Sequence, residues 1–200
     1  MPNPIEFYFD FSSPYSYLAS EKIEALAARY GRRVQFKSIL LGAAFQAAGT
    51  RPLVDIPLKG EYSKRDIERS ARYEGVPLAL PQPFPIGTVG AARAQLWLSD
   101  RDAERADAFV HAAFRAYFVR GRNIGLGDVL EQVLREVGAD AAEVLQAIQQ
   151  PAIKERLKSQ VDGALARGVF GAPFIFIDGE PFWGNDRMPQ IERWLAQGPF

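Results

Sequence analysis

The chain has 200 residues, of which 48% are hydrophobic and 24% are charged, and its 24 basic residues balance its 24 acidic ones. This composition is typical of a globular protein with a core of useful size, and it lacks the clustered excess of Lys and Arg that nucleic acids and anionic membranes require. The chain has no cysteine and one histidine, His111, which excludes disulfides, cysteine-based zinc sites and a protein-borne thiol, and makes a His-based metal site or a Ser-His-Asp triad hard to build.

The first ten residues lack the positive segment and the long apolar stretch of a signal peptide. No apolar run approaches the roughly 20 residues that a membrane-spanning helix needs. We therefore expect a cytoplasmic protein without a metal, a nucleic-acid partner or a membrane partner.

The start of the chain predicts a strand, a helix and a second strand. Residues 5–9 are apolar and aromatic, residues 15–30 show helical periodicity that Gly31 ends, and residues 34–41 indicate another strand. Pro14 suits the first turn of the helix, because its missing N–H costs nothing there.

The middle of the chain is mostly helical. A stretch rich in Pro and Gly covers residues 51–88, with a short helix expected near 64–73. Further helices with Ala-rich apolar stripes are expected at 91–98, 102–118, 128–137, 141–149 and 151–166. We find no internal repeat.

The end of the chain predicts a hairpin and a helix. Residues 174–177 are a strong strand pattern, Asp178-Gly179 is a two-residue hairpin turn, and residues 180–183 form the returning strand. Residues 184–187 then open a final helix.

The order β-α-β, helices, β-β-α predicts an α/β fold of the thioredoxin-like type with an inserted all-helical domain. We expect the thioredoxin-like domain at 1–41 and 166–200 and the inserted domain at 42–165. Such frames place the active site at the N-terminus of the first helix, where free N–H groups and the helix dipole stabilise negative charge.

The segment Ser13-Pro14-Tyr15-Ser16 lies where a redox protein of this fold carries Cys-x-x-Cys. One interpretation is that Ser12 or Ser13 only caps the helix, which contributes about 0.5–2 kcal/mol. The other is that Ser13 donates a hydrogen bond to an anion at the helix N-terminus, and a thiolate is such an anion. Because no adjacent base is visible, Ser13 is a poor nucleophile.

Two further segments carry candidate functions. The frame predicts a cis proline at Ala172-Pro173, which exposes backbone groups to an extended peptide ligand; the alternative is an ordinary proline at a strand start. Asn185 and Asp186 either cap the last helix or bind an amino-acid headgroup, and the two roles can coexist. Lys59, taken alone, indicates a solvated loop lysine.

The residues at 8–18, 168–173 and 182–187 together resemble the 2-hydroxychromene-2-carboxylate isomerases. Residues 50–69 also echo the pattern Asn-x-Pro-Pro…Pro-x-Lys-x-x-Tyr…Asp-x-x-Arg of that family. The resemblance covers nearly the whole chain and implies a DsbA-like fold related to the kappa-class glutathione transferases.

By this resemblance, Ser13 would hydrogen-bond the sulfur of glutathione and favour its thiolate. Lys59 would approach glutathione, and Ala172, before the cis proline Pro173, would pair its backbone with the cysteinyl part. Asn185 and Asp186 would hold the γ-glutamyl end of glutathione. Thr50 and Phe84 would contact the substrate.

The implied activity is a glutathione-dependent isomerisation of 2-hydroxychromene-2-carboxylate to trans-o-hydroxybenzylidenepyruvate by a homodimer that takes small aromatic carboxylates. Four residues depart from the family pattern and place the identity of the substrate in question: Thr50, Leu53, Ser63 and Gly87. Two alternatives therefore stay open. One is a kappa-class-like transferase or peroxidase, and the other is a thioredoxin-like binding module without catalysis. A thiol–disulfide oxidoreductase is excluded, because no residue can form the mixed disulfide.

Overall fold

The structure is a computed structural model that describes residues 3–200. Its strands are β1 (Ile5–Phe9), β2 (Val34–Ser38), β3 (Phe174–Ile177) and β4 (Glu180–Trp183). Its helices are α1 (Pro14–Arg29), α2 (Leu41–Ala47), α3 (Lys59–Glu74), α4 (Val89–Ser99), α5 (Ala103–Phe118), α6 (Gly127–Glu136), α7 (Ala141–Ala147), α8 (Pro151–Ala166) and α9 (Met188–Gln197). Short 3₁₀ turns are η1 (Leu53–Asp55) and η2 (Asn185–Arg187).

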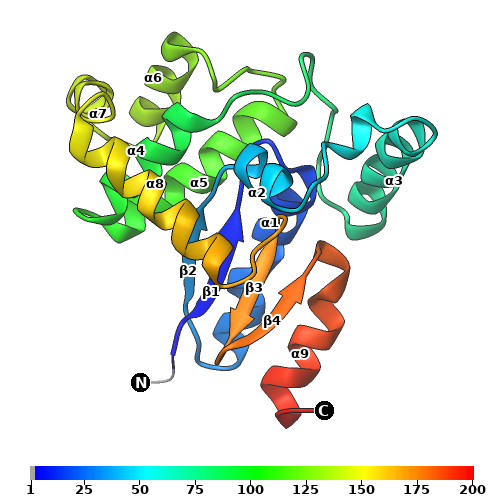
Figure 1. Cartoon of the computed structure of the whole chain (residues 1–200). Helices are drawn as coiled ribbons and strands as arrows, with labels where there is room; N and C mark the ends of the chain where they lie inside the picture. The colour runs from blue at the N-terminus through cyan, green and yellow to red at the C-terminus, as the bar shows by residue number, and fades with distance from the viewer. Residues whose placement is uncertain (1–2) are drawn as a thin grey trace.

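The strands form one mixed sheet in the order β2-β1-β3-β4, in which β1 pairs parallel with β2 and antiparallel with β3. The turn Asp178-Gly179 joins β3 and β4 with both residues at positive φ, as a two-residue hairpin requires. The predicted order β-α-β, helices, β-β-α and the thioredoxin-like fold are confirmed. Figure 1 shows the sheet below the helices that the middle of the chain supplies.

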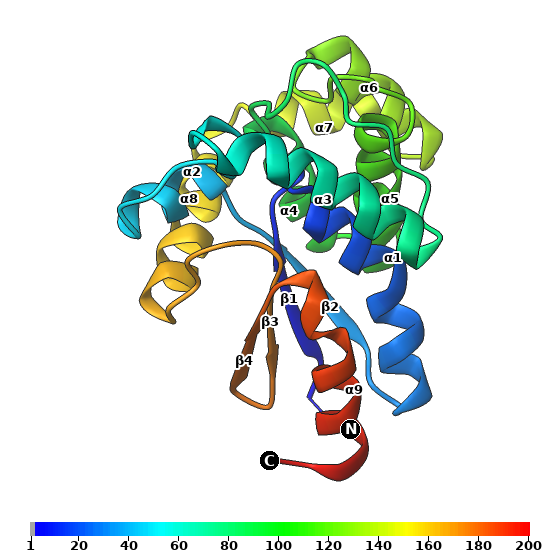
Figure 2. The ribbon, with the colours of Figure 1, turned by 90° about the vertical axis from the view of Figure 1, so that its right-hand side faces the viewer.

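The sheet is covered on both faces, and the side-chain alternation of its strands explains why. Phe7 and Phe9 point into a core with α1, α5 and α9, whereas Tyr8 and Phe176 point into a second core with α4 and α8. Figure 2 shows α8 on one side of the sheet and α1 with α9 on the other. Within residues 3–200, no helix is both long and apolar enough to cross a membrane.

Aromatic rings join the end of β1 to the helices above it. Phe9 and Phe11 lie 5.5 and 5.3 Å from Phe114 of α5, measured between ring centroids, and all three are fully buried. Such close aromatic pairs rigidify a core. This cluster fixes the point at which the chain leaves the sheet and enters the Ser13 turn.

Two expected boundaries were wrong. The second strand ends at Ser38, and a helix that we did not predict, α2, begins at Leu41, whose N–H donates to the Asp10 carboxylate over 2.7 Å. A carboxylate that accepts a helix-terminal N–H stabilises that helix start, and Asp10 lies too far away in sequence to be recognised as its partner.

Helix α3 begins at Lys59, five residues before the expected start near 64. Leu58 has φ 68° and ψ −43°, and the Lys59 N–H donates to the Pro57 carbonyl over 2.8 Å, which is a γ-turn. Gly60 follows, and a Cβ there would lie 2.5 Å from the Val54 carbonyl oxygen. The helix therefore starts where a tight turn and a glycine let it approach η1.

Candidate active site

Ser13 sits at the N-cap of α1 and is 3% exposed. Its Oγ accepts a hydrogen bond from the Ser16 N–H over 3.1 Å and donates one to the Ala172 carbonyl over 3.0 Å. Ser13 therefore caps α1, and its contact with an anion stays a prediction. The hydroxyl also links the first helix to a segment 159 residues later in the chain.

The turn that carries Ser13 is held by a buried carboxylate that the sequence analysis missed. Asp10 Oδ1 accepts from the Ser12 N–H at 2.8 Å, the Ser12 hydroxyl at 3.0 Å and the Thr88 hydroxyl at 2.9 Å, while Oδ2 accepts from Leu41. Burial raises the pKa of Asp10, and these four hydrogen bonds act in the opposite direction. The Asp10 side chain thus holds the end of β1 and the first residues of α2 and α4 together around the Ser13 turn.

The predicted cis peptide at Ala172-Pro173 is confirmed. The Pro173 carbonyl accepts from the Gly184 N–H over 3.0 Å, which holds this segment against the chain entering η2. At Gly171 a Cβ would lie 2.7 Å from Trp183 Nε1, so the close approach of the Trp183 indole requires a glycine there.

These segments open onto one large cavity of about 1570 Å³. Ser13, Ala172 and Pro173 lie in its wall at one end of α1, and Asn185 and Asp186 lie in the same wall. Five residues that the sequence placed far apart are therefore brought together at one site. Typical ligand pockets measure about 300–1,000 Å³, so this cavity is large enough for more than one small ligand.

The rest of the cavity wall is largely apolar. Phe84 and Thr50, the two candidate substrate residues, both line it, together with Phe45, Ile86 and Trp183. A flat apolar molecule would bury surface against these side chains. Lys59 differs from the other candidates, because it is exposed and is not among the residues that line the cavity. Its contact with glutathione stays a prediction.

Asn185 is buried, and its amide donates to Glu74 Oε1 over 2.6 Å. Glu74 in turn pairs with Lys22, with 2.7 Å between the ammonium and Oε2. Asp186 is exposed and pairs with Arg187 at 3.1 Å. Neither η2 nor α9 has a side-chain cap bond, so the interpretation of Asn185 or Asp186 as a helix cap is wrong.

A second polar pair lies in the same cavity wall. The Tyr15 hydroxyl donates to Asp66 Oδ2 over 2.6 Å, and Asp66 also pairs with Arg69. Burial, and then the hydrogen bond to Asp66, raise the pKa of Tyr15, so the phenol keeps its proton at neutral pH. The pair joins α1 to α3 at the edge of the site.

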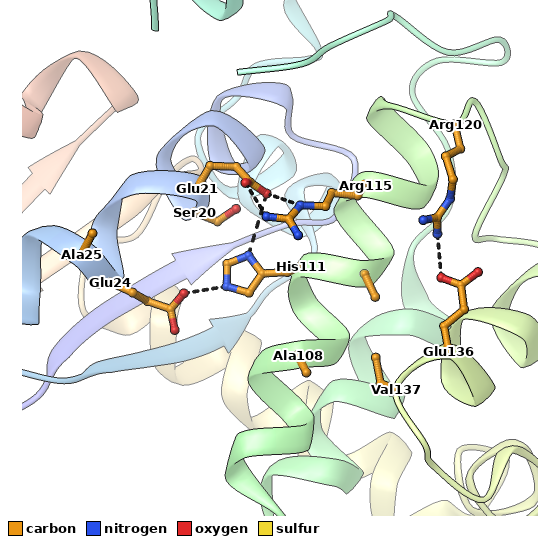
Figure 3. A pocket seen from close by; sticks show the side chains of 11 residues that line it. Ser20, Glu21, Glu24, Ala25, Ala108, His111, Arg115, Arg120, Glu136 and Val137 are labelled. Atoms are coloured by element: carbon orange, nitrogen blue, oxygen red, sulfur yellow. Dashed lines mark hydrogen bonds and ion pairs between the residues drawn. The ribbon is translucent and has the colours of Figure 1, made fainter. Parts of the chain in front are cut away.

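A separate hollow of about 630 Å³ lies between α1 and α5 (Figure 3). Its charged side chains are already paired with one another, as His111 with Glu24 at 2.6 Å and Arg115 with Glu21 at 2.6 Å. Within residues 3–200 no group of three His, Cys, Asp or Glu side chains could hold a metal ion. Paired charges in a wall need no ligand, so we assign the functional site to the cavity at Ser13.

Comparison with known proteins agrees with this geometry. The model of the DsbA-like thioredoxin domain matches residues 4–196. The chain is 36% identical over 201 residues to a 2-hydroxychromene-2-carboxylate isomerase of Sphingobium xenophagum, covering 98% of this chain and 99% of that one. It is 27% identical over 215 residues to a glutathione S-transferase kappa 2 of Caenorhabditis elegans, covering 100% and 95%.

A solved structure of a 2-hydroxychromene-2-carboxylate isomerase aligns with a TM-score of 0.87 at 31% identity, covering 96% of this chain and 94% of that one. The similarity thus extends over nearly the whole chain. The chain belongs to the 2-hydroxychromene-2-carboxylate isomerase family of DsbA-like thioredoxin folds.

Proposed function

We propose that this protein is a glutathione-dependent isomerase that converts 2-hydroxychromene-2-carboxylate to trans-o-hydroxybenzylidenepyruvate in aromatic catabolism. The observation that carries the proposal is a buried serine at the N-terminus of α1, facing a cis proline in a large cavity, in a chain without cysteine. The names of the relatives support the reaction and the use of glutathione.

The residues present fit a tripeptide thiol. Pro14 has no N–H and the Ser16 N–H is bonded to Ser13, so the N-terminus of α1 offers the Tyr15 N–H and the positive end of a helix dipole, which favour a thiolate. The backbone before Pro173 can pair with an extended peptide, and Asn185 Oδ1 is a buried acceptor without a partner within residues 3–200. These features match the sulfur, the cysteinyl backbone and the amino-acid end of glutathione.

Bound at Ser13, Ala172 and Asn185, glutathione would supply a thiolate for reversible nucleophilic catalysis of the isomerisation. Ser13 holds the negative charge through its hydroxyl, which turns from the Ala172 carbonyl to the ligand. Asp10 keeps the turn rigid, because its four hydrogen bonds fix the positions of Ser12, of Thr88 and of Leu41 at the start of α2. Phe84 and Trp183 line the cavity and would pack against the bound ligand.

The direct test is stopped-flow absorbance with 2-hydroxychromene-2-carboxylate, with and without glutathione. We expect a fast spectral change that requires glutathione. An equal rate without glutathione would remove the thiol from the mechanism, and no change under either condition would remove the substrate.

The kappa transferases among the relatives favour a second candidate, conjugation or peroxidase activity at the same site. Thr50 lines the cavity, and it departs from the family pattern, which favours a substrate other than the chromene acid. Turnover of an aryl halide or a hydroperoxide without chromene isomerisation would select this function. Calorimetry with glutathione separates both enzymes from a binding module without catalysis, for which no heat is expected. The homodimer and the cytoplasmic location stay predictions.

A further inference from the structure

The side-chain amide of Asn185 has one defined orientation. A carboxylate only accepts hydrogen bonds, so the amide NH₂ must face Glu74 Oε1, 2.6 Å away. The carbonyl oxygen Oδ1 then points elsewhere, and it has no partner within residues 3–200 although Asn185 is 6% exposed. A buried acceptor without a partner costs free energy, so its presence in a cavity wall indicates a ligand that donates a hydrogen bond.

Glu74 of α3, which accepts from Asn185 of η2, is also held in place by a residue of α1. It is the last residue of α3, its side chain is 14% exposed, and Lys22 of α1 pairs with its second oxygen. Asn185 therefore donates a hydrogen bond to one oxygen of the carboxylate, and Lys22 forms an ion pair with the other oxygen, which accepts no hydrogen bond within residues 3–200. The ion pair balances the negative charge of Glu74 within the protein. Lys22, Glu74 and Asn185 all lie in the wall of the Ser13 cavity.

We infer that Lys22 and Glu74 are positioning residues that lock the Asn185 carbonyl toward the α-ammonium group of a γ-glutamyl thiol. This inference rests on the proposed function and deepens it, because it names the chemistry at the far end of the cofactor and the residues that set it.

The charge balance explains why three residues are used. An unpaired Glu74 would itself attract the ligand's ammonium group and displace it from the carbonyl. The ion pair with Lys22 offsets the charge of Glu74 and so weakens its attraction for a second ammonium group, although Glu74 Oε2, like Asn185 Oδ1, accepts no hydrogen bond within residues 3–200. Asp186, exposed in the same wall, is paired with Arg187, so its charge is balanced as well. Of the two charged groups at a γ-glutamyl end, the ammonium donates hydrogen bonds and the carboxylate only accepts them, so an acceptor without a partner selects the ammonium.

The test combines two protein variants with two ligands. Glu74→Met frees the Asn185 amide to turn, and Asn185→Leu removes the acceptor. The ligands are glutathione and glutaryl-cysteinylglycine, which is glutathione without its amino group. Calorimetry gives the dissociation constant for each combination, and Glu61→Met is the matched control, because Glu61 pairs with Lys64 on the same helix outside the cavity.

For the wild type and Glu61→Met we expect glutathione to bind at least about 10-fold more tightly than the deaminated ligand, the value of one hydrogen bond to a charged group. In Glu74→Met and Asn185→Leu this preference should fall toward 1, while the deaminated ligand binds within about 3-fold of wild type. Equal weakening of both ligands would indicate a merely structural role and overturn the inference alone. A wild type that binds neither ligand would overturn the proposed function and this inference together.

Discussion

Replacing Ser13 by Ala removes one oxygen that serves two hydrogen bonds. The Ser16 N–H loses its cap, which costs about 0.5–2 kcal/mol, and the Ala172 carbonyl loses its donor, which costs about 1 kcal/mol more. We therefore expect Ser13→Ala to fold with a free energy of unfolding lower by about 1–3 kcal/mol. Urea unfolding followed by circular dichroism measures this loss.

The effect on a bound thiolate is calculated from the same two bonds. A hydrogen bond to a charged group contributes about 1.5–3 kcal/mol, but the hydroxyl must first release Ala172, which costs about 0.5–1.5 kcal/mol. The net stabilisation of the thiolate by Ser13 is then about 1–2 kcal/mol, which raises the pKa of bound glutathione by about one unit when Ser13 is removed. Turnover at pH 7 should fall by about 10-fold, and less at pH 9.

Thiolate absorbance in the ultraviolet, measured against pH for the bound cofactor, checks this expectation together with the pH profile of kcat/KM. The matched control is Asp102→Ala, because Asp102 caps α5 by accepting from the Arg105 N–H at 2.9 Å and does not line the cavity. Asp102→Ala should lose similar stability and keep the thiolate pKa. An unchanged thiolate pKa in Ser13→Ala would refute the role of the hydroxyl and leave only the cap.

Three further predictions concern stability and are checked by urea unfolding. The Ser16 hydroxyl is fully buried without a partner within residues 3–200, so Ser16→Ala should raise stability by about 1 kcal/mol, and a loss of that size would contradict the unsatisfied hydroxyl. The hydrogen bond from Arg167 lowers the pKa of Glu6 to about 2, so the stabilisation is complete above pH 4.5 and is lost as pH falls toward 2. Because solvent screens this partly exposed carboxylate, Glu6→Gln should cost about 1 kcal/mol at pH 7, with a smaller difference at pH 3. Burial, and then Glu24, raise the pKa of Asp107 to about 6 from 3.8, so the wild type loses stability as pH rises from about 4 to 6. Because solvent screens this half-buried carboxyl group, Asp107→Asn should gain about 1 kcal/mol at pH 7 and nothing at pH 3.

The order of strands and helices was predictable because each pattern is local. The strand Ile5–Phe9 and the hairpin at Asp178-Gly179 follow from short runs of apolar residues and one turn dipeptide. Helix α2 was not predictable in this way. Its first N–H is bonded to Asp10, which precedes it by 31 residues, and one of its residues alone, Ala44, is buried. Long-range contacts stabilise such elements, and sequence periodicity does not report them.

The same distinction between local patterns and long-range contacts holds for the residues of the candidate site. Ser13 and Pro173 stood out because each occupies a fixed place in the expected frame, and both lie in the cavity wall. Lys22 and Glu74 carry no such signal, because a charged residue on a helix usually faces solvent. Only the packing of α1, α3 and η2 brings Lys22 and Glu74 to Asn185. A residue that acts through another residue is visible only in the folded protein.

The absence of cysteine limits the chemistry that this fold can perform. Ser13 and Ser16 occupy the two positions of Cys-x-x-Cys, and Ser16 is fully buried, so neither can form or resolve a disulfide. The helix N-terminus and its dipole do not depend on cysteine, and a helix dipole stabilises an anion whichever residue caps the helix. A chain that keeps the anion site and lacks the thiol can use thiolate chemistry only if the ligand brings the sulfur. The ligand must then be held at its far end as firmly as at its sulfur, because no covalent bond to the protein retains it. This is the role that the locked Asn185 carbonyl would have in the proposed enzyme.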